Sequence, residues 1–247
     1  MIGDRVTPSL TPVRVVREAL GQQVANYLRD AIVRGQLTAG QRLVETDIAE
    51  SLEVSRGPVR DGFKILEVEG LIAKRGQGYV VLSLADSDIR ELYSLREALE
   101  SLALRLAMEQ EPLPDLAPLR ESIMRMRIAA EAGNVEAFAR ADIGFHAALC
   151  DVSGHRRVAA VWRQHEPITT ALIGATVLLD SDLNKTAERH LDIVRLIEAG
   201  DVNDALAELH DHLHGSEDNM RAAWSRISAA AAEGADSDSS IAGAAGA

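Results

Sequence analysis

The residues best suited to chemistry form an Asp-x-x-x-His pair inside an apolar helical stripe. Asp142 and His146 lie one helical turn apart, and Phe138, Phe145 and Leu149 share their face at helical spacing. An inward-facing carboxylate and imidazole are costly unless they are paired, and this spacing lets both side chains reach one metal ion. A direct hydrogen bond between the two would satisfy them equally well, so the motif alone leaves both interpretations open.

Two further histidines extend this candidate site. His190 shares a helical face with Val194 and Ile197, and His212 follows Leu209 by about one turn, so we expect both imidazoles to face inward. Three imidazoles and one carboxylate from three helices form a nitrogen and oxygen donor set that suits a divalent ion. We expect zinc first, with nickel or manganese as alternatives.

The other histidines and the single cysteine are not expected to bind this ion. His210 and His214 share a face by helical spacing and are interpreted as surface residues, while His155 and His165 lack an apolar stripe that carries a carboxylate. Cys150 lies in an Ala- and Leu-rich helical stretch that is typical of a buried free thiol. We assign no catalytic role to any residue.

A second group of residues suits contact with duplex DNA. A predicted helix opens with Ser55 as its N-cap, continues through Arg56 and Gly57, and reaches Arg60 one turn later. Arg56 and Arg60 therefore point outward together, where a guanidinium group can contact guanine in the major groove. Two exposed arginines can also be merely solvated, but the short helix before them and the basic hairpin after them favour DNA.

The elements that must position these arginines are predicted from spacing and turn residues. An apolar stripe ends at Gly35, a short amphipathic helix covers 45–52, and a second helix runs from Ser55 to about Glu69. The segment LIAKRGQGYVVL then predicts two short strands joined by a glycine-containing turn. This order predicts a winged helix-turn-helix over residues 16–83, preceded by a disordered arm at 1–15.

The remainder predicts a helical bundle over residues 86–228. Proline, glycine and polar breaks divide it into about six helices at 86–110, 115–132, 135–152, 155–179, 183–199 and 202–227. Short connections imply antiparallel neighbours, so the chain is expected to be mainly α. Residues 229–247 are rich in Ala, Gly, Ser and Asp, and we expect them to form a disordered tail.

Charge is distributed unevenly between these two parts. The 247-residue chain has a net charge of -12, but residues 1–83 hold 11 Lys and Arg against 10 Asp and Glu, which leaves 15 against 28 in the rest. The acidity therefore belongs to the bundle and does not oppose DNA binding by the first part. With no run of 18 apolar residues and no signal sequence, we expect a cytoplasmic protein that has no membrane partner.

The first part resembles the GntR-type winged-helix domain. The shared motif residues are Ile32 with Gly35, Gly40 with Leu43, Ile48-Ala49, Val54-Ser55-Arg56, Pro58-Val59-Arg60, Leu66 with Glu69-Gly70-Leu71, and Gly76 with Gly78. The resemblance implies that Arg34, Arg42, Arg56 and Arg60 contact DNA, with Gly76 at the wing tip. Ala39 replaces the usual proline, Gly57 stands where threonine is common and would remove a hydroxyl that contacts phosphate, and Asp61-Gly62 replaces Glu-Ala.

The second part resembles the FCD effector domain of the FadR-type branch of that family. Asp142, His146, His190 and His212 occupy the positions of its metal ligands, and Arg96 matches an arginine near its effector pocket. The resemblance implies a homodimeric, ligand-responsive regulator, more often a repressor, in which the metal anchors a carboxylate effector. Arg96 and Glu100 could instead form a surface pair at four-residue spacing.

Two other functions remain open from the sequence. The His and Asp site would also fit a metal-dependent hydrolase, although no HExxH, GxSxG or P-loop pattern and no candidate general base accompany it. The second alternative is a DNA-binding regulator whose bundle serves only dimerisation, with the buried Asp and His hydrogen-bonded and metal-free.

Overall fold

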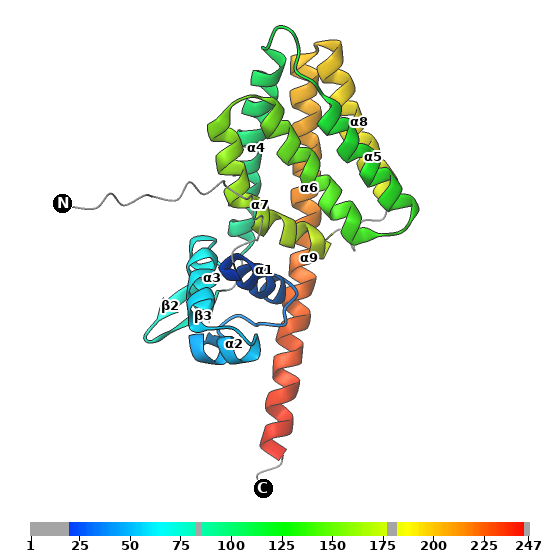
Figure 1. The fold of residues 1–247 in the computed structure, drawn as a ribbon. Helices are drawn as coiled ribbons and strands as arrows, with labels where there is room; N and C mark the ends of the chain where they lie inside the picture. The colour runs from blue at the N-terminus through cyan, green and yellow to red at the C-terminus, as the bar shows by residue number, and fades with distance from the viewer. Residues whose placement is uncertain (1–19, 83–84, 177–181, 245–247) are drawn as a thin grey trace, which may run out of the picture.

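The computed structural model describes residues 20–82, 85–176 and 182–244, and within these ranges the chain forms nine helices and one three-stranded sheet. A small mixed part and a larger all-helical part are joined as the sequence predicts, which confirms the fold class (Figure 1). The arm predicted at 1–15 lies outside the described residues. Within the described residues, no helix combines the length and the apolar character needed to cross a membrane.

The first part has the order of a winged helix-turn-helix. Its elements are α1 (Leu20–Val33), β1 (Arg42–Leu43), α2 (Glu45–Ser51), α3 (Arg56–Val68), β2 (Ile72–Arg75) and β3 (Gly78–Val81). The two predicted wing strands are antiparallel, and β1 adds a third strand, in which Arg42 pairs with Val80 and Leu43 with Tyr79. The sequence analysis missed β1 because two residues are too few to show an alternating pattern.

A buried ion pair fixes the end of α3 against α1. The guanidinium of Arg29 donates from Nε and Nη2 to the two carboxylate oxygens of Glu69 at 2.8 and 2.6 Å. Both side chains are almost inaccessible to solvent, and a two-pronged contact of this kind sets the relative orientation of the two helices. The position of α3, which carries the candidate DNA-contacting arginines, is therefore tied to the scaffold.

Gly62 lets α1 and α3 approach closely. A Cβ atom at this position would lie 3.0 Å from the carbonyl oxygen of Gly21 and 3.0 Å from Cγ1 of Val24. Gly57, by contrast, has no heavy atom within 4 Å of its would-be Cβ. Both glycines depart from the family pattern, but packing requires a glycine only at position 62.

Gly57→Ala and Gly62→Ala are expected to change stability in opposite directions. Alanine at the open position should stabilise the fold by about 0.5–1 kcal/mol, because glycine loses more backbone freedom on folding. Alanine at the packed position should destabilise it by about 1–3 kcal/mol through overpacking. Thermal unfolding of both variants measures this, and a lower midpoint for Gly57→Ala or an unchanged one for Gly62→Ala would contradict it.

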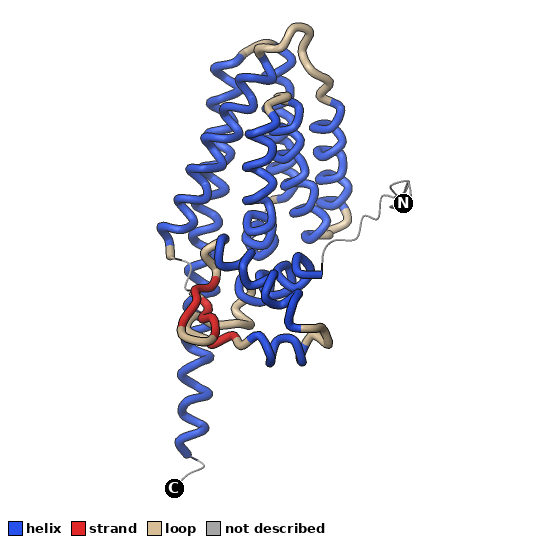
Figure 2. Tube along the Cα trace, turned by 60° about the vertical axis from the view of Figure 1, so that its left-hand side comes forward, coloured by secondary structure: helices blue, strands red, loops and turns tan. Residues whose placement is uncertain are grey.

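The second part is a bundle of six long helices. These are α4 (Asp86–Met108), α5 (Ala117–Glu131), α6 (Val135–Val152), α7 (Arg156–Thr176), α8 (Leu183–Ala199) and α9 (Val202–Ala244). The helices run roughly along one direction in Figure 2, with α4 packed on α9 and α5 on both α6 and α8. The breaks after α4, α5, α6 and α8 agree closely with those expected from proline and glycine, while the polar break expected between 179 and 183 lies mostly outside the described residues.

Helix α9 is longer than the sequence analysis predicts. It extends out of the bundle past the first part and continues to Ala244, over most of the segment expected to be a disordered tail (Figures 1 and 2). The run Ala229–Ala232 favours the first turn of the extension, because alanine has the highest helix propensity of all residues. The predicted helix end near 227 gave more weight to the Gly, Ser and Asp residues that follow, which have low helix propensity.

The two parts share one hydrophobic core. Ile89 and Tyr93 of α4, Leu172 of α7 and Met220 of α9 are buried in the same cluster as the core of the winged helix-turn-helix, and α1 packs on α7. A second cluster fills the interior of the bundle between α5, α6, α8 and α9. Helices α4, α6, α7 and α9 contribute residues to both clusters and therefore connect the bundle interior with the first part.

Candidate functional site

Four predicted side chains meet in the interior of the bundle. Asp142 and His146 come from α6, His190 from α8 and His212 from α9, and all four are buried. One donor atom from each lies within 4.8 Å of the others. The hydrophobic stripe on α6 produces this arrangement, because it turns Asp142 and His146 inward together with Phe138, Phe145 and Leu149.

The distances between these donor atoms suit one shared ion. Oδ1 of Asp142 lies 3.2 Å from Nε2 of His190, and Oδ2 lies 3.9 Å from Nε2 of His146. The Nε2 atoms of His146 and His212 are 3.4 Å apart. Donors bound at about 2.0–2.2 Å to a single ion lie roughly 3.0–3.6 Å from one another, so only a small adjustment would be needed.

A hydrogen bond fixes the orientation of the His190 imidazole. Nδ1 of His190 lies 2.8 Å from the carbonyl oxygen of Thr186, which can only accept, so Nδ1 carries the proton and Nε2 presents a lone pair. Nε2 of His190 has no partner of good hydrogen-bond geometry among the described residues, although the Asp142 carboxylate lies beside it. A lone pair that faces a carboxylate without a proton between them indicates a place for a cation.

The site also keeps its donors in the protonation states that a metal requires. Burial alone would raise the pKa of Asp142, but the surrounding imidazoles of His190, His146 and His212 hold it well below its usual value. Burial and the neighbouring imidazoles of His190 and His146 lower the pKa of His212 well below its usual value. An ionised carboxylate beside a neutral imidazole is the state in which both bind metal.

Glu100 of α4 is a site residue that the sequence analysis did not identify. Its Oε2 lies 2.6 Å from Nδ1 of His146, and its Oε1 accepts from Nε of Arg96 at 3.2 Å. Carboxylates in this position orient metal-bound imidazoles. The alternative of a surface pair between Arg96 and Glu100 was therefore wrong in its location, because the two side chains are 1 % and 0 % exposed.

The interior position of Glu100 has a sequence signal. On α4 the buried residues Ile89, Tyr93, Arg96, Glu100 and Leu104 recur at spacings of three and four, so the pair belongs to the inward face of the helix. Charged residues are almost never fully buried unless they are paired. A charged pair at the centre of this apolar stripe therefore indicates a buried ion pair.

Arg96 and Trp162 place two unused donors beside the cluster. The guanidinium of Arg96 lies over the rings of Tyr93 at 4.9 Å and Trp162 at 5.5 Å, and Trp162 lies 6.1 Å from the His146 ring. Nη1 of Arg96 and Nε1 of Trp162 are buried and have no hydrogen-bond partner within the described part of the chain. Buried donors are seldom left unsatisfied, so this pair points to an acceptor-bearing ligand.

The remaining histidines and the cysteine lie where the sequence analysis expects. His210 and His214 are exposed on α9, and His165 is half-buried on α7. His155 is exposed, and its Nδ1 accepts from the backbone N–H of Val158, which caps the start of α7. Burial raises the pKa of the Cys150 thiol, so this cysteine is not a nucleophile.

The candidate DNA-contacting residues all lie on the surface of the first part. The exposed set is Arg34, Arg42, Ser55, Arg56, Gly57, Arg60 and Gly76. Ser55 occupies the N-cap position of α3 as predicted, but its side chain makes no capping hydrogen bond within the described structure. Gly76 has a φ of +60°, which glycine adopts readily and which shapes the wing turn.

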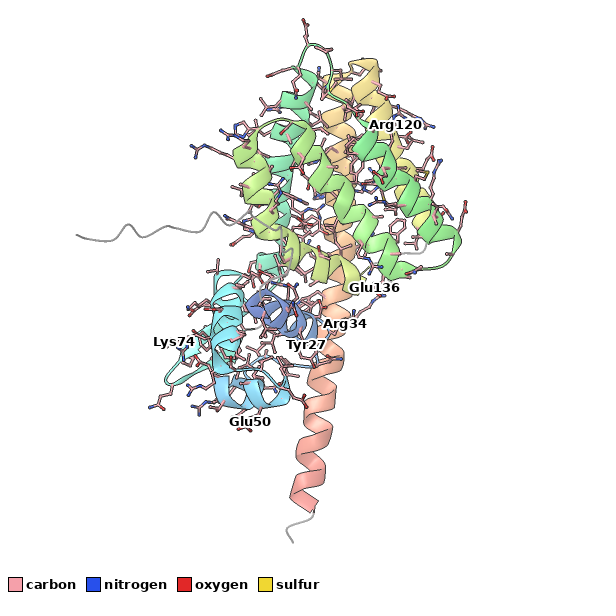
Figure 3. All side chains as sticks on the ribbon, in the orientation of Figure 1. Tyr27, Arg34, Glu50, Lys74, Arg120 and Glu136 are labelled. Atoms are coloured by element: carbon pink, nitrogen blue, oxygen red, sulfur yellow. The ribbon has the colours of Figure 1, made fainter. Side chains whose placement is uncertain are left out.

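These residues are not all close together. Arg56 and Arg60 lie in the first turns of α3, and Arg42 starts β1 beside the wing. Figure 3 shows Arg34 at the end of α1 and Lys74 of the wing at opposite edges of this part. The structure therefore brings Arg56 and Arg60 together on α3, while Arg34 lies on a different element, just after α1.

Comparison with known protein families assigns both halves. Residues 20–81 match the family described as bacterial regulatory proteins, gntR family, and residues 91–215 match the FCD domain. The chain is a GntR-family regulator with an FCD domain. A member of this family is a DNA-binding transcriptional regulator, and the winged helix-turn-helix and the helical bundle described above are its two functional parts.

Curated relatives of this GntR-family regulator span nearly its whole length. The "Probable D-xylose utilization operon transcriptional repressor" of Paenarthrobacter nicotinovorans is 32 % identical over 204 residues, which cover 82 % of this chain and 89 % of the relative. The "Gluconate operon transcriptional repressor" of Bacillus subtilis (strain 168) is 26 % identical over 213 residues, with coverage of 84 % and 88 %.

Solved structures show the same fold. A putative GntR transcriptional regulator from Rhodococcus sp. RHA1 aligns with a TM-score of 0.62 and 26 % identity, covering 82 % of this chain and 98 % of the other. E. coli McbR/YncC aligns with a TM-score of 0.64 and 21 % identity over 83 % and 98 % of the two chains.

Proposed function

We propose that this GntR-family regulator is a cytoplasmic homodimeric repressor that releases its operator when a small carboxylate binds inside the FCD domain. The observation that carries the proposal is the buried cluster of three histidines and one aspartate beside two unpartnered donors. Both relatives described above are named as repressors, which favours repression over activation. Two copies are needed because one recognition helix covers only half of a palindromic operator.

In the DNA complex, α3 lies in the major groove. Arg56 and Arg60 contact base edges, the N–H groups at Ser55 and Gly57 approach phosphate, and Gly76 brings the wing tip to the neighbouring groove. Arg42, beside the wing, contacts the phosphate backbone. Arg34 reaches the duplex only if DNA extends across to the far edge of the winged helix-turn-helix.

In the FCD domain, Asp142, His146, His190 and His212 hold a divalent ion. The donor chemistry fits zinc first, with nickel or manganese as alternatives. When bound, such an ion supplies a positive charge with open coordination positions for a carboxylate. Glu100 holds the His146 ring and the Thr186 carbonyl holds the His190 ring, so that both lone pairs point to the ion.

The unpartnered donors define the rest of the effector. Arg96 offers Nη1 to an anionic oxygen, and Trp162 offers its indole N–H to a second acceptor such as a hydroxyl. A sugar acid carries both groups, and the relative named for the gluconate operon is consistent with this class. We therefore propose a hydroxylated carboxylic acid as the effector.

The shared hydrophobic core provides the route from effector to DNA. Helix α4 carries Arg96 and Glu100 at the site and Ile89 in the core shared with the winged helix-turn-helix. Helix α7 carries Trp162 at the site and packs on α1 near its other end. A shift of either helix on ligand binding changes the placement of α3. A coupling free energy of about 1.4 kcal/mol between the effector site and the DNA site is enough for a tenfold change in operator affinity.

Trp162→Phe is expected to weaken binding of the effector without changing binding of the metal. The variant keeps an aromatic ring over Arg96 but removes the N–H, so affinity for the effector should fall by about 3- to 10-fold. A panel of sugar acids that begins with D-gluconate is titrated calorimetrically into metal-loaded wild type and variant, and tested for release of bound DNA. Binding that is equally tight in both proteins, or no binding by any acid, would contradict this effector class.

A further inference from the structure

One carboxylate lies between the two arginines of the recognition helix. Glu45, the first residue of α2, accepts from Nε and Nη2 of Arg60 at 3.3 and 3.1 Å and from Nη2 of Arg56 at 3.4 Å. Its side chain is 21 % exposed, whereas those of Arg60 and Arg56 are 53 % and 60 % exposed. The carboxylate is thus partly covered by the arginines, which remain open to solvent.

The contact with Arg60 is the stronger of the two. The hydrogen bonds that Arg60 donates to Glu45 lower the pKa of Glu45 and raise the pKa of Arg60, so both groups are charged at neutral pH. Within the described part of the chain, Arg60 donates to Glu45 from Nε and Nη2 and makes no hydrogen bond from Nη1, while Arg56 donates from Nη2 alone. Each guanidinium therefore retains donors that can face DNA.

The geometry points to a role for Glu45 as a specificity-determining positioning residue, an inference that rests on the proposed contact of Arg56 and Arg60 with DNA. Glu45 holds both guanidinium groups at fixed positions for base edges and cancels part of their charge. Fixing the long side chains in advance removes an entropic cost from base contact. The partial cancellation of charge weakens the attraction of the two arginines to phosphates. This attraction does not depend on the DNA sequence.

The two effects act together on discrimination. Specificity is the difference between binding the operator and binding other DNA, so a group that weakens only the sequence-independent attraction raises the ratio of the two. An exposed ion pair contributes little to folding stability. Loss of Glu45 should therefore appear in DNA selectivity and hardly at all in thermal unfolding.

Asp47 provides a matched control for position and charge. It lies with Glu45 in the first turn of α2, where both favour the helix N-terminus, but its recorded side-chain contact is a hydrogen bond from Thr46. Glu45→Gln and Asp47→Asn therefore remove the same charge from the same turn. Only the first also replaces one of the two acceptor oxygens between the arginines with an NH2 group, which can only donate.

The test uses the full-length homodimer and two duplexes. One duplex is selected by the wild-type protein from a random-sequence pool, and the other has the same composition in shuffled order. Fluorescence anisotropy at several salt concentrations gives both dissociation constants. For Glu45→Gln we expect binding of the shuffled duplex to strengthen by about 3- to 10-fold, with a steeper salt dependence, and the selectivity ratio to fall about 10-fold or more.

For Asp47→Asn, both affinities should rise by similar factors, so the selectivity ratio should stay within about twofold of wild type. Glu45→Asp, which retains the charge but shortens the reach, should weaken binding of the selected duplex and leave the shuffled duplex unchanged. An unchanged ratio in Glu45→Gln, or the same ratio change in Asp47→Asn, would overturn the role of Glu45. If Glu45→Gln does not fold, an unaltered ratio in Glu45→Asp would overturn it.

The failure of this inference can be separated from the failure of the proposed DNA contacts. If alanine at Arg56 and Arg60 leaves the selected duplex bound, the proposed contacts themselves are wrong. If those alanines abolish binding but Glu45→Gln keeps the wild-type ratio, only the role of Glu45 is wrong.

Discussion

Alanine at both Arg56 and Arg60 is expected to reduce affinity for a selected duplex by at least about 100-fold at physiological salt. A good arginine contact to guanine is worth about 1–3 kcal/mol of discrimination, and the double variant removes two of them. The two side chains are exposed and pair only with Glu45 among their recorded ion pairs, so the fold should not depend on them. Fluorescence anisotropy with a labelled duplex measures the loss.

A remote arginine serves as the control for overall charge. Arg125 on α5 is 66 % exposed and paired with Glu121 one turn away, well outside the winged helix-turn-helix. Arg125→Ala should leave DNA binding within about twofold of wild type, since charges beyond a Debye length are screened. Retention of tight, sequence-selective binding by the double alanine variant would refute the placement of α3 in the major groove.

His190→Ala is expected to reduce the metal content from one ion per chain to nearly none. It deletes an imidazole that the Thr186 carbonyl holds in place and that lies 3.2 Å from the Asp142 carboxylate. A ligand present at 100 times its dissociation constant stabilises the folded state by about 2.7 kcal/mol. For a chain of this size, chelation of the wild type should therefore lower the unfolding midpoint by about 5–10 °C.

Elemental analysis and thermal unfolding with and without chelator measure both effects. His210→Ala is the matched control, because His210 lies on α9 near His212 but is exposed and bonded to Glu97. That variant should keep its metal and its response to chelator. Wild-type protein that carries no metal after growth and purification with added zinc, nickel or manganese would support a metal-free dimerisation bundle instead.

The interior histidines were predictable because helical periodicity decides which face of a helix each residue occupies. Within His210-Asp211-His212-Leu213-His214, the spacing from Leu209 turns His212 inward and leaves His210 and His214 in solvent, as the structure shows. The sequence placed the four donors on inward faces of three helices. Only the packed bundle shows that those faces meet.

The roles of Glu100 and Trp162 could not be predicted from the sequence. Both lie on inward faces of their helices, but their roles depend on α4 and α7 lying beside α6, which is a tertiary fact that no local pattern contains. The same limit applies to Glu45 and the arginines, which are 11 and 15 residues apart and meet only because α2 packs on α3. Strand β1 was missed for a different reason, since its pairing comes from β3 and not from its own two residues.

The continuous core across the two parts also limits how this regulator can be recombined with others. Ile168, Leu172 and Ile173 of α7 and Met220 of α9 are buried together with residues of the winged helix-turn-helix. A hybrid that joins residues 1–82 to an unrelated sensor would expose to water the apolar face of the DNA-binding half that packs against these residues, at a cost of about 25 cal/mol for each Å². Successful hybrids would have to exchange the facing side chains of α7 and α9 together with the DNA-binding half.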